Sequence, residues 1–311
     1  YDSILTHGFV VDGKGRKMSK SLGNVISPDE IMKNFGVDIL RLWVVASDYY
    51  DDLKLDKSIL NAQTDSYRRI RNTFRYIIGN LNNFNDNEKI DIEKFPELEK
   101  YILHRVWEIN EIIEKCILNF NFHLMFTTLL NFCSNDLSSF YFDIRKDTIY
   151  CDSKDSVKRR SARTLLDILF NLLVRWLAPT LVFTCEEAWK SRGNKDSIHL
   201  ENFKKIDNNF KNENIAKKWE IIKDVRKVIT AALEKKREEK IIGSSLESSL
   251  NIFATPEICS LLNKSDLAEI AIVSSAKLIE TDNFNKGFAI DEIKGISVQV
   301  KKSSGKKCNR C

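Results

Sequence analysis

Residues that interrupt helices are scarce in this sequence. Only 4 prolines and 11 glycines occur among 311 residues, and these two residue types disfavour a helix interior most. No run reaches the ~18 to 20 apolar residues that a membrane-spanning helix needs. The first residues also lack the basic and then apolar pattern of a signal peptide. We therefore expect a mainly helical chain without a membrane segment.

The sequence also lacks a disulfide framework and a large excess of either basic or acidic residues. The 7 cysteines are scattered apart from one close pair near the end, which excludes a disulfide-stapled secreted domain and favours a reducing, cytoplasmic compartment. The 49 basic and 44 acidic residues leave a net charge of only +5. That charge is too small to identify a nucleic-acid-binding protein by itself, so the distribution of charge must carry the argument.

Composition and length fit a globular protein. The chain is 43% hydrophobic and 30% charged, and its length suffices for about two domains. It begins without Met and ends within a cysteine motif, so we expect a fragment of a longer protein. We also expect a monomer.

Apolar residues recur at helical spacing through the middle of the chain. The pattern predicts long helices over residues 62–81, 97–118, 123–144, 156–190 and 215–240. Pro179 lies within the fourth helix and should kink it, because proline removes one backbone donor. Gly243 follows the fifth helix and is expected to cap it.

The two ends of the chain have different patterns. Residues 4–11 predict a short strand, and Ser27 followed by Pro28 predicts the N-cap and first turn of a helix. Near the other end, the segments SLNIFA, EIAIV and ISVQV predict strands that alternate with short helical pieces. The expected fold class is therefore mainly α, with a small α/β domain at the C-terminal end.

Aromatic residues on the helices are interpreted mainly as core. Phe140, Tyr141 and Phe142 could stack on unpaired bases, but three consecutive positions cannot share one helix face, so at least two should pack inside. Three further aromatic residues on an apolar helix are likewise expected in the core: Trp176, Phe183 and Trp189. The 4 histidines are isolated and show no ligand spacing.

The strongest candidate for chemistry is the loop segment Lys17, Met18, Ser19, Lys20 and Ser21, which glycines flank on both sides. Its two lysines can converge on a polyphosphate, while the small serines allow close approach and offer donors. An arbitrary pair of lysines at this spacing is usually a solvated basic turn. The whole string around the lysines therefore decides the interpretation.

The string GRKMSKSLGN, preceded by THGFVVDG and followed by SPDEI and DILRLW, resembles the KMSKS region of class I aminoacyl-tRNA synthetases, in the branch specific for isoleucine, valine, leucine and methionine. The resemblance implies that the loop closes over ATP, which Mg²⁺ accompanies. It also implies that Lys20 contacts the phosphates as pyrophosphate leaves and that Lys17 is the supporting charge. A mobile cation that reaches the phosphates mainly in the closed state stabilises the transition state more than the ground state.

Further strings extend the resemblance, and together they are most similar to the isoleucine-specific members: SYRRIRNTFR, NFCSNDLSSFYFDIRKDTIY, RWLAPTLVFTCEEAW, IIGSSLES and CNRC. The resemblance implies the end of a catalytic domain over residues 1–62, a helical anticodon-binding domain over 63–214, a connecting helix over 215–248 and a small α/β tail over 249–311. The implied activity is ATP-dependent activation of isoleucine and its transfer to tRNA(Ile). The family's HIGH signature, amino-acid pocket and editing domain are absent from these residues, so the fragment alone is expected to be inactive.

Arginines gather on the first long helix of the expected anticodon-binding domain. At about 100° per residue, Arg68, Arg71 and Arg75 share one stripe, while Arg69 lies on the far side. A stripe of arginines suits contact with a phosphate backbone. The alternative is an exposed face whose charge is balanced by acids from neighbouring helices.

Cys308 and Cys311 have the C-x-x-C spacing of half a zinc site. Neighbouring lysines would favour thiolates and contact with RNA, and the family completes this motif with a second cysteine pair. The alternative is a pair of free thiols. Two other functions also stay open: a valine, leucine or methionine enzyme, and a non-catalytic tRNA-binding protein derived from a synthetase, which would have no use for a complete KMSKS loop.

Overall fold

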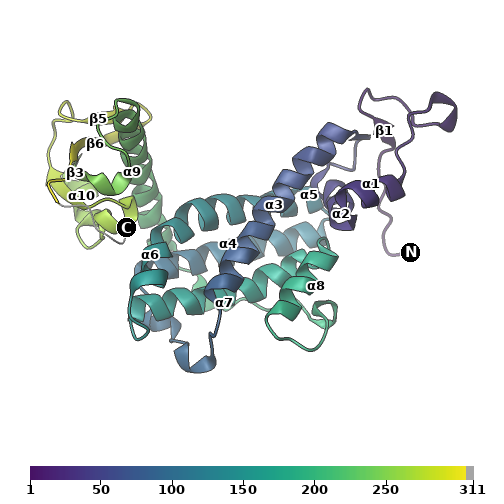
Figure 1. Ribbon diagram of the computed structural model, residues 1–311, viewed down its shortest axis with the longest axis horizontal. Helices are drawn as coiled ribbons and strands as arrows, with labels where there is room; N and C mark the ends of the chain where they lie inside the picture. The colour runs from purple at the N-terminus through teal and green to yellow at the C-terminus, as the bar shows by residue number, and fades with distance from the viewer. Residues whose placement is uncertain (306–311) are drawn as a thin grey trace. The chain divides into compact units, whose positions relative to one another are not determined.

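The structure is a computed structural model that describes residues 1–305 (Figure 1). The chain divides into two compact units, Tyr1–Lys211 and Asn212–Cys311. Helices predominate, and a small sheet occurs in the second unit, so the predicted fold class is confirmed. No helix of the described residues is long and apolar enough to span a membrane.

The first unit starts with a short α/β segment. Its elements are β1 (Val10–Asp12), the 3₁₀ turn η1 (Lys20–Leu22), α1 (Pro28–Phe35), α2 (Val37–Ala46) and β2 (Leu53–Leu55). β1 and β2 pair in parallel. As predicted, α1 starts after Ser27, whose hydroxyl accepts from the N–H of Glu30 at 3.2 Å. The strand predicted over residues 4–11 is mostly wrong, because β1 begins only at Val10 and the preceding residues are exposed or half-buried loop.

A helical bundle forms the rest of the first unit. Its long elements are α3 (Lys57–Asn80), α4 (Glu97–Leu118), α5 (Phe122–Asn131), the π-helical segment η4 (Phe132–Phe142), α6 (Asp143–Cys151), α7 (Val157–Leu177) and α8 (Val182–Ser191). Short 3₁₀ turns lie at η2 (Asp86–Glu88), η3 (Ile92–Lys94), η5 (Ile198–Leu200) and η6 (Asn208–Phe210). The core contains large side chains with almost no exposed surface, among them Phe132, Tyr141, Phe170 and Trp176.

The bundle departs from the predicted helices at two places. The helix predicted over 123–144 is one helical run, but its middle, η4, is wound as a π-helix. Phe140, Tyr141 and Phe142 are all buried there, which confirms their assignment to the core. At Pro179 the predicted kink is wrong, because the helix ends: α7 stops at Leu177 and α8 begins at Val182.

Of the three aromatic residues around this break that were predicted to lie in the core, two do so. Trp176 and Trp189 are buried, whereas the side chain of Phe183 is 65% exposed, so its prediction is wrong. The physical reason is the break itself. Two separate helices do not share the helical phase that a single helix from 156 to 190 would impose on Phe183.

The second unit is a long helix followed by an α/β domain. Its elements are α9 (Glu213–Glu238), the 3₁₀ turn η7 (Ser245–Glu247), β3 (Ser248–Ala254), α10 (Pro256–Leu262), α11 (Leu267–Ala271), β4 (Ser275–Glu280), β5 (Phe288–Ile290) and β6 (Ile293–Lys302). The strand order is β4-β3-β6-β5. β3 pairs in parallel with β4 and antiparallel with β6, which pairs antiparallel with β5.

Two predictions in this unit need correction. The segment EIAIV, predicted as a strand, forms most of α11 and the residues just after it, and the strand comes later, as β4. A short apolar run does not distinguish a buried helical turn from a strand. Gly243 does not cap α9. Instead Lys240 takes the left-handed conformation with φ 56°, and the N–H of Ile241 donates to the carbonyl of Lys236 at 3.0 Å, which closes the helix end.

Candidate functional site

Asp12 anchors the lysine-containing loop where the loop leaves β1. The carboxylate atom Oδ1 accepts from the backbone N–H groups of Lys14 at 3.0 Å and Arg16 at 2.9 Å. The N–H of Gly15 donates to the carbonyl of Asp12 at 2.8 Å, and Gly15 has φ 77°, a conformation that favours glycine. The chain therefore turns tightly around one carboxylate before it reaches the lysines.

Side chains complete the shell of donors around Asp12. Arg16 Nε donates to Oδ2 at 2.9 Å, and Asn24 Nδ2 donates to the same oxygen at 3.0 Å. These donors, with Asn24 contributing most, hold the pKa of Asp12 well below its usual range. Asp12 is thus a carboxylate under all ordinary conditions and a permanent anchor for the loop.

Asn24 ties the two ends of the loop together. Besides Asp12, its Nδ2 donates to the carbonyl of Lys17 at 3.2 Å, and its Oδ1 accepts from the N–H of Ser19 at 2.9 Å. Ser19 in turn caps η1, because its hydroxyl accepts from the N–H of Leu22 at 3.3 Å. The backbone on either side of Met18, which packs against the buried core of this segment, is therefore held by polar contacts.

Lys17 and Lys20 project from this anchored backbone into solvent. Both side chains are exposed, and within residues 1–305 neither ammonium has an ion-pair or hydrogen-bond partner. The hydroxyls of Ser19 and Ser21 lie 3.1 Å apart beside them. The segment thus presents two free cations and small hydroxyl donors on a fixed base, which is an arrangement suited to a polyphosphate.

Arg68, Arg71 and Arg75, three of the four arginines of α3, are all exposed and lie away from the buried face that carries Ile70 and Ile77. Arg68 pairs with Asp65 at 3.1 Å, and both side chains are more than half exposed. Arg71 and Arg75 have no ion-pair partner among the described residues. Asp65 belongs to α3 itself, so among the described residues no acid of a neighbouring helix balances these three arginines. An exposed pair such as Arg68 and Asp65 contributes only about 0 to 1 kcal/mol.

Two residues of α2 that the sequence analysis did not single out join the loop segment to the bundle. Asp38 accepts from the N–H of Thr184 at 2.8 Å and from its hydroxyl at 2.6 Å. Arg41 donates to the carbonyls of Thr180 at 3.0 Å and Pro179 at 2.7 Å. A carboxylate at a helix N-terminus compensates the unpaired N–H groups there. A signal did exist, since Asp38 and Arg41 interrupt an otherwise apolar helix at a spacing that places them on one side.

The candidate zinc ligands Cys308 and Cys311 lie outside the described residues. Among residues 1–305, no three His, Cys, Asp or Glu side chains are grouped so that they could hold a metal ion. Burial raises the pKa of the Cys133 thiol to about 12 and also raises the pKa values of Cys116 and Cys185. These buried thiols are therefore neutral in the metal-free protein.

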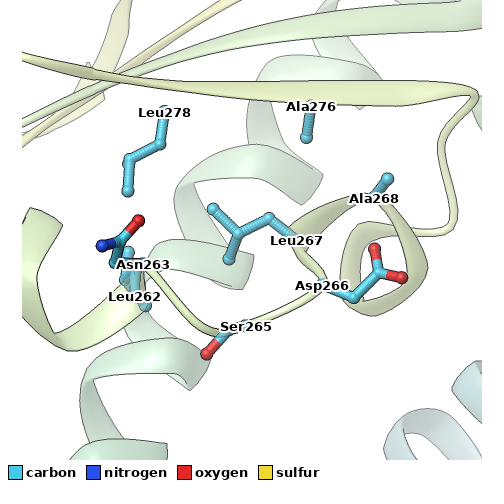
Figure 2. Close-up of a pocket in the computed structure, with 8 residues that line it drawn as sticks. All are labelled: Leu262, Asn263, Ser265, Asp266, Leu267, Ala268, Ala276 and Leu278. Carbon is cyan, nitrogen blue, oxygen red and sulfur yellow. The ribbon is translucent and has the colours of Figure 1, made fainter.

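The described part of the second unit also contains a pocket of about 240 Å³ (Figure 2). The residues that line the pocket come from α10, α11, β4 and the turn between the two helices, and all but one are uncharged: Leu262, Asn263, Ser265, Asp266, Leu267, Ala268, Ala276 and Leu278. The one charged group, Asp266, accepts from the N–H of Glu269 at 3.0 Å as the cap of α11. A pocket with a carboxylate and no cation does not suit a phosphate group.

Two models of protein families match parts of this chain. Residues 1–56 match the model of tRNA synthetases class I (I, L, M and V), and residues 99–252 match that of the anticodon-binding domain of tRNA ligase. The isoleucine–tRNA ligase of Pelagibacter ubique is 48% identical over 315 residues, which cover 100% of this chain and 34% of that protein. That of Agrobacterium fabrum is 44% identical, with 100% and 32% covered.

A solved structure shares the fold. The ternary complex of Agrobacterium radiobacter K84 agnB2 LeuRS, tRNA and LeuAMS superposes with a TM-score of 0.51 at 19% identity, covering 84% of this chain and 30% of that one. The chain spans about a third of the length of the curated relatives it matches. On these matches, the chain belongs to the class I tRNA synthetases of the isoleucine, leucine, methionine and valine branch.

Proposed function

We propose that this chain is part of an isoleucine–tRNA ligase and supplies its ATP-phosphate loop and its tRNA anticodon-binding domain. In the proposed reaction, the carboxylate of isoleucine attacks the α-phosphorus of ATP and pyrophosphate leaves. The acyl group of the resulting adenylate then passes to tRNA(Ile), and AMP leaves. The observation that carries the proposal is the pair of free, exposed ammonium groups on the loop anchored by Asp12. The identity of 48% to an isoleucine–tRNA ligase supports the choice of amino acid.

Within this proposal the chain is organised as the resemblance implies. Residues 1–62 are the end of the catalytic domain, 63–214 the anticodon-binding domain, 215–248 a connecting helix and 249–311 the tail that leads to the cysteine pair. The substrates are isoleucine, ATP with its Mg²⁺, and tRNA(Ile). The protein is a monomer and acts in the cytoplasm.

The loop residues divide the work of phosphate binding. Lys20 meets the negative charge that builds on the departing pyrophosphate, and Lys17 is the supporting cation. Ser19 and Ser21 offer hydroxyl donors to phosphate oxygens, and Met18 holds the middle of the loop on the core. Cations placed where charge develops contribute to catalysis most when their geometry is fixed in advance. The contacts of Asp12 and Asn24 with the loop backbone support that geometry.

Arg68, Arg71 and Arg75 of α3 bind the tRNA backbone in this proposal. Arg71 and Arg75 are exposed and unpaired within the described residues, and Arg68 needs to exchange only a solvent-exposed aspartate for a phosphate. Arginine suits this role because its planar group binds phosphate through two parallel hydrogen bonds.

Cys308 and Cys311 contribute two thiolates to a zinc site in this proposal. A tetrahedral structural site takes four ligands, so two further ligands must come from other parts of the full-length protein. Metal analysis of full-length protein with and without the substitution Cys308→Ala tests the assignment. Equal zinc content in the two proteins would contradict it.

The test of the proposed function is Lys20→Ala in the full-length enzyme. Loss of one well-placed electrostatic donor typically lowers the rate by a factor of about 10² to 10³, and we expect adenylate formation to slow by that factor with little change in isoleucine affinity. Lys17→Ala should have a milder effect. The measurement is pre-steady-state adenylate formation at saturating ATP and isoleucine.

Lys14→Ala is the matched control. Lys14 is an exposed lysine of the same loop whose backbone N–H, not its ammonium, contacts Asp12. Its replacement should leave adenylate formation near the wild-type rate. Equal rates for Lys20→Ala and Lys14→Ala, with both proteins folded, would remove the catalytic role of the loop and leave tRNA binding without catalysis.

A further inference from the structure

The four-stranded sheet of the second unit has one face that helices cover. Ala276 and Leu278 of β4 point toward α10 and α11, across the pocket in Figure 2. α9 packs on the same two helices, where Arg226 Nε of α9 donates to the carbonyl of Ile270 at 3.1 Å. Because successive side chains of a strand alternate between faces, Lys277, between Ala276 and Leu278, belongs to the opposite face.

Six polar residues form a grid on that opposite face. In one row across the sheet, Lys277 lies opposite Asn251 of β3, which lies opposite Gln299 of β6. A second row lies two residue positions further along the strands, where Ser249 of β3 lies between Ser275 of β4 and Lys301 of β6. We call these six residues the polar grid: Ser249, Asn251, Ser275, Lys277, Gln299 and Lys301. Within it, Asn251 Nδ2 donates to Gln299 Oε1 at 3.2 Å.

The polar grid carries positive charge and no negative charge. Lys277 and Lys301 are exposed, the two amides are half-buried, and none of the six side chains is a carboxylate. Within residues 1–305 neither lysine has an ion-pair partner. The two lysines occupy diagonal corners, about 12 Å apart as judged from strand spacing and rise per residue. Hydroxyl and amide groups fill the space between them.

Among the described residues, the strand positions of this face carry no exposed aromatic side chain that could stack on a base. Phe253, the next residue of β3 on this face, is only 8% exposed, and Ser297 opposite it is fully buried. Sheets that read unpaired bases do so with exposed aromatic side chains. Ammonium, amide and hydroxyl groups instead suit phosphate oxygens and ribose hydroxyls, which carry no base sequence.

We propose that the polar grid binds the phosphate and ribose backbone of RNA. Given the proposed function, on which this inference rests, that RNA is the tRNA the enzyme acylates. Lys277 and Lys301 contact phosphates, and Asn251, Gln299 and the serines contact ribose hydroxyls and phosphate oxygens between them. The second unit thereby adds affinity for tRNA without reading its sequence.

The test compares two double variants of the full-length enzyme. Lys277→Gln with Lys301→Gln removes both cations of the polar grid. The matched control, Lys264→Gln with Lys302→Gln, removes the same charge. Lys302 neighbours Lys301 but lies on the other face of β6, and Lys264 is an exposed residue between α10 and α11. Binding of a tRNA(Ile) transcript is titrated over a series of salt concentrations.

We expect the grid variant to bind tRNA on the order of 5-fold more weakly at moderate salt. Its log-log salt slope should fall by about 1.4 to 1.8, because each lost phosphate contact lowers the slope by about 0.7 to 0.9. The control should keep the wild-type affinity and slope. A non-cognate tRNA should lose affinity by the same factor, since backbone contacts do not read sequence.

Aminoacylation kinetics separate this inference from the proposed function. The grid variant should raise KM for tRNA and leave the rate of adenylate formation unchanged. If wild-type enzyme forms adenylate but the grid variant binds tRNA as the control does, the inference is wrong while the proposed function stands, and the face then serves another ligand such as an acidic protein segment. If wild-type enzyme forms no adenylate, the proposed function itself fails.

Discussion

Replacement of Glu99 tests the best-defined polar contact of the bundle core. Glu99 is fully buried on α4 and accepts from Arg145 Nε at 2.6 Å, from Arg145 Nη2 at 2.9 Å and from the Tyr141 hydroxyl at 3.1 Å. Glu99→Ala leaves the buried guanidinium of Arg145 without this carboxylate. Breaking a buried pair from one side costs roughly 3 to 5 kcal/mol of unfolding free energy. For a unit of this size, each kcal/mol lowers Tm by about 2 to 4 °C, so we expect a drop of roughly 6 to 20 °C.

Thermal melting of the variant and two companions measures this effect. Tyr141→Phe removes only one of the three hydrogen bonds, which is worth about 1 kcal/mol, and should lower Tm by about 2 to 4 °C. The double variant Glu99→Leu with Arg145→Met removes both charges and keeps the volume, so it should recover most of the stability. A melting temperature of Glu99→Ala within 2 °C of wild type, or a double variant less stable than Glu99→Ala, would refute the reasoning.

The contact between Tyr141 and Glu99 also predicts the direction in which folding stability changes with pH. Burial, with the nearby charge of Glu99, raises the pKa of Tyr141 well above its ordinary value. The phenol is therefore the protonated donor in the folded state, while the unfolded chain ionises near pH 10. Its contribution to stability is present below that pH and is lost as the pH rises further. Alkaline unfolding should be less steep in Tyr141→Phe than in wild type.

Three further predictions concern the candidate sites. Asn24→Ala removes the largest contribution to the low pKa of Asp12 and frees the loop; adenylate formation should slow by about tenfold, and a wild-type rate would show that the anchor is dispensable. The low pKa of Asp12 gives an anchor that is present above pH 4 and lost only as the pH falls further. Titration of Asp12 should therefore not change loop function between pH 5 and 8. Arg71→Ala with Arg75→Ala should lower the salt slope of tRNA binding by about 1.4 to 1.8, whereas Arg69→Ala, on another face of α3, should not change it.

Helices with a regular apolar period could be predicted from the sequence, and breaks in that period could not. The helix expected over 97–118 is α4, residue for residue, because its apolar positions keep one phase for six turns. The π-helical winding of η4 was invisible, since a π-turn shifts the phase without any proline or glycine to mark it. The short apolar segment EIAIV failed for the related reason that five residues do not define a period.

The lysine loop was identified from its string of residues, but its anchor was missed. The string from Lys17 to Ser21 indicates phosphate binding, and its five residues lie on one short segment. Asp12 and Asn24 hold that segment from either side. An Asp beside a glycine turn and an Asn after a glycine are typical of side chains that bond to nearby backbone, so a local signal was present. What the sequence could not supply is that the two side chains meet each other.

The start of α8 was the least predictable part of the first unit, because its N-cap lies in another part of the chain. Leu181 occupies the N-cap position and has no side chain that can cap the helix. Asp38 supplies that acceptor from α2, 146 residues away from Thr184 in sequence. These bonds hold the first turn of α8 in the phase that turns Thr184 inward and leaves Phe183 outside. The helix that provides them also carries Ile39 and Trp43 in the core on which Met18 packs, so the base of the lysine loop and the entry to α8 depend on the same helix.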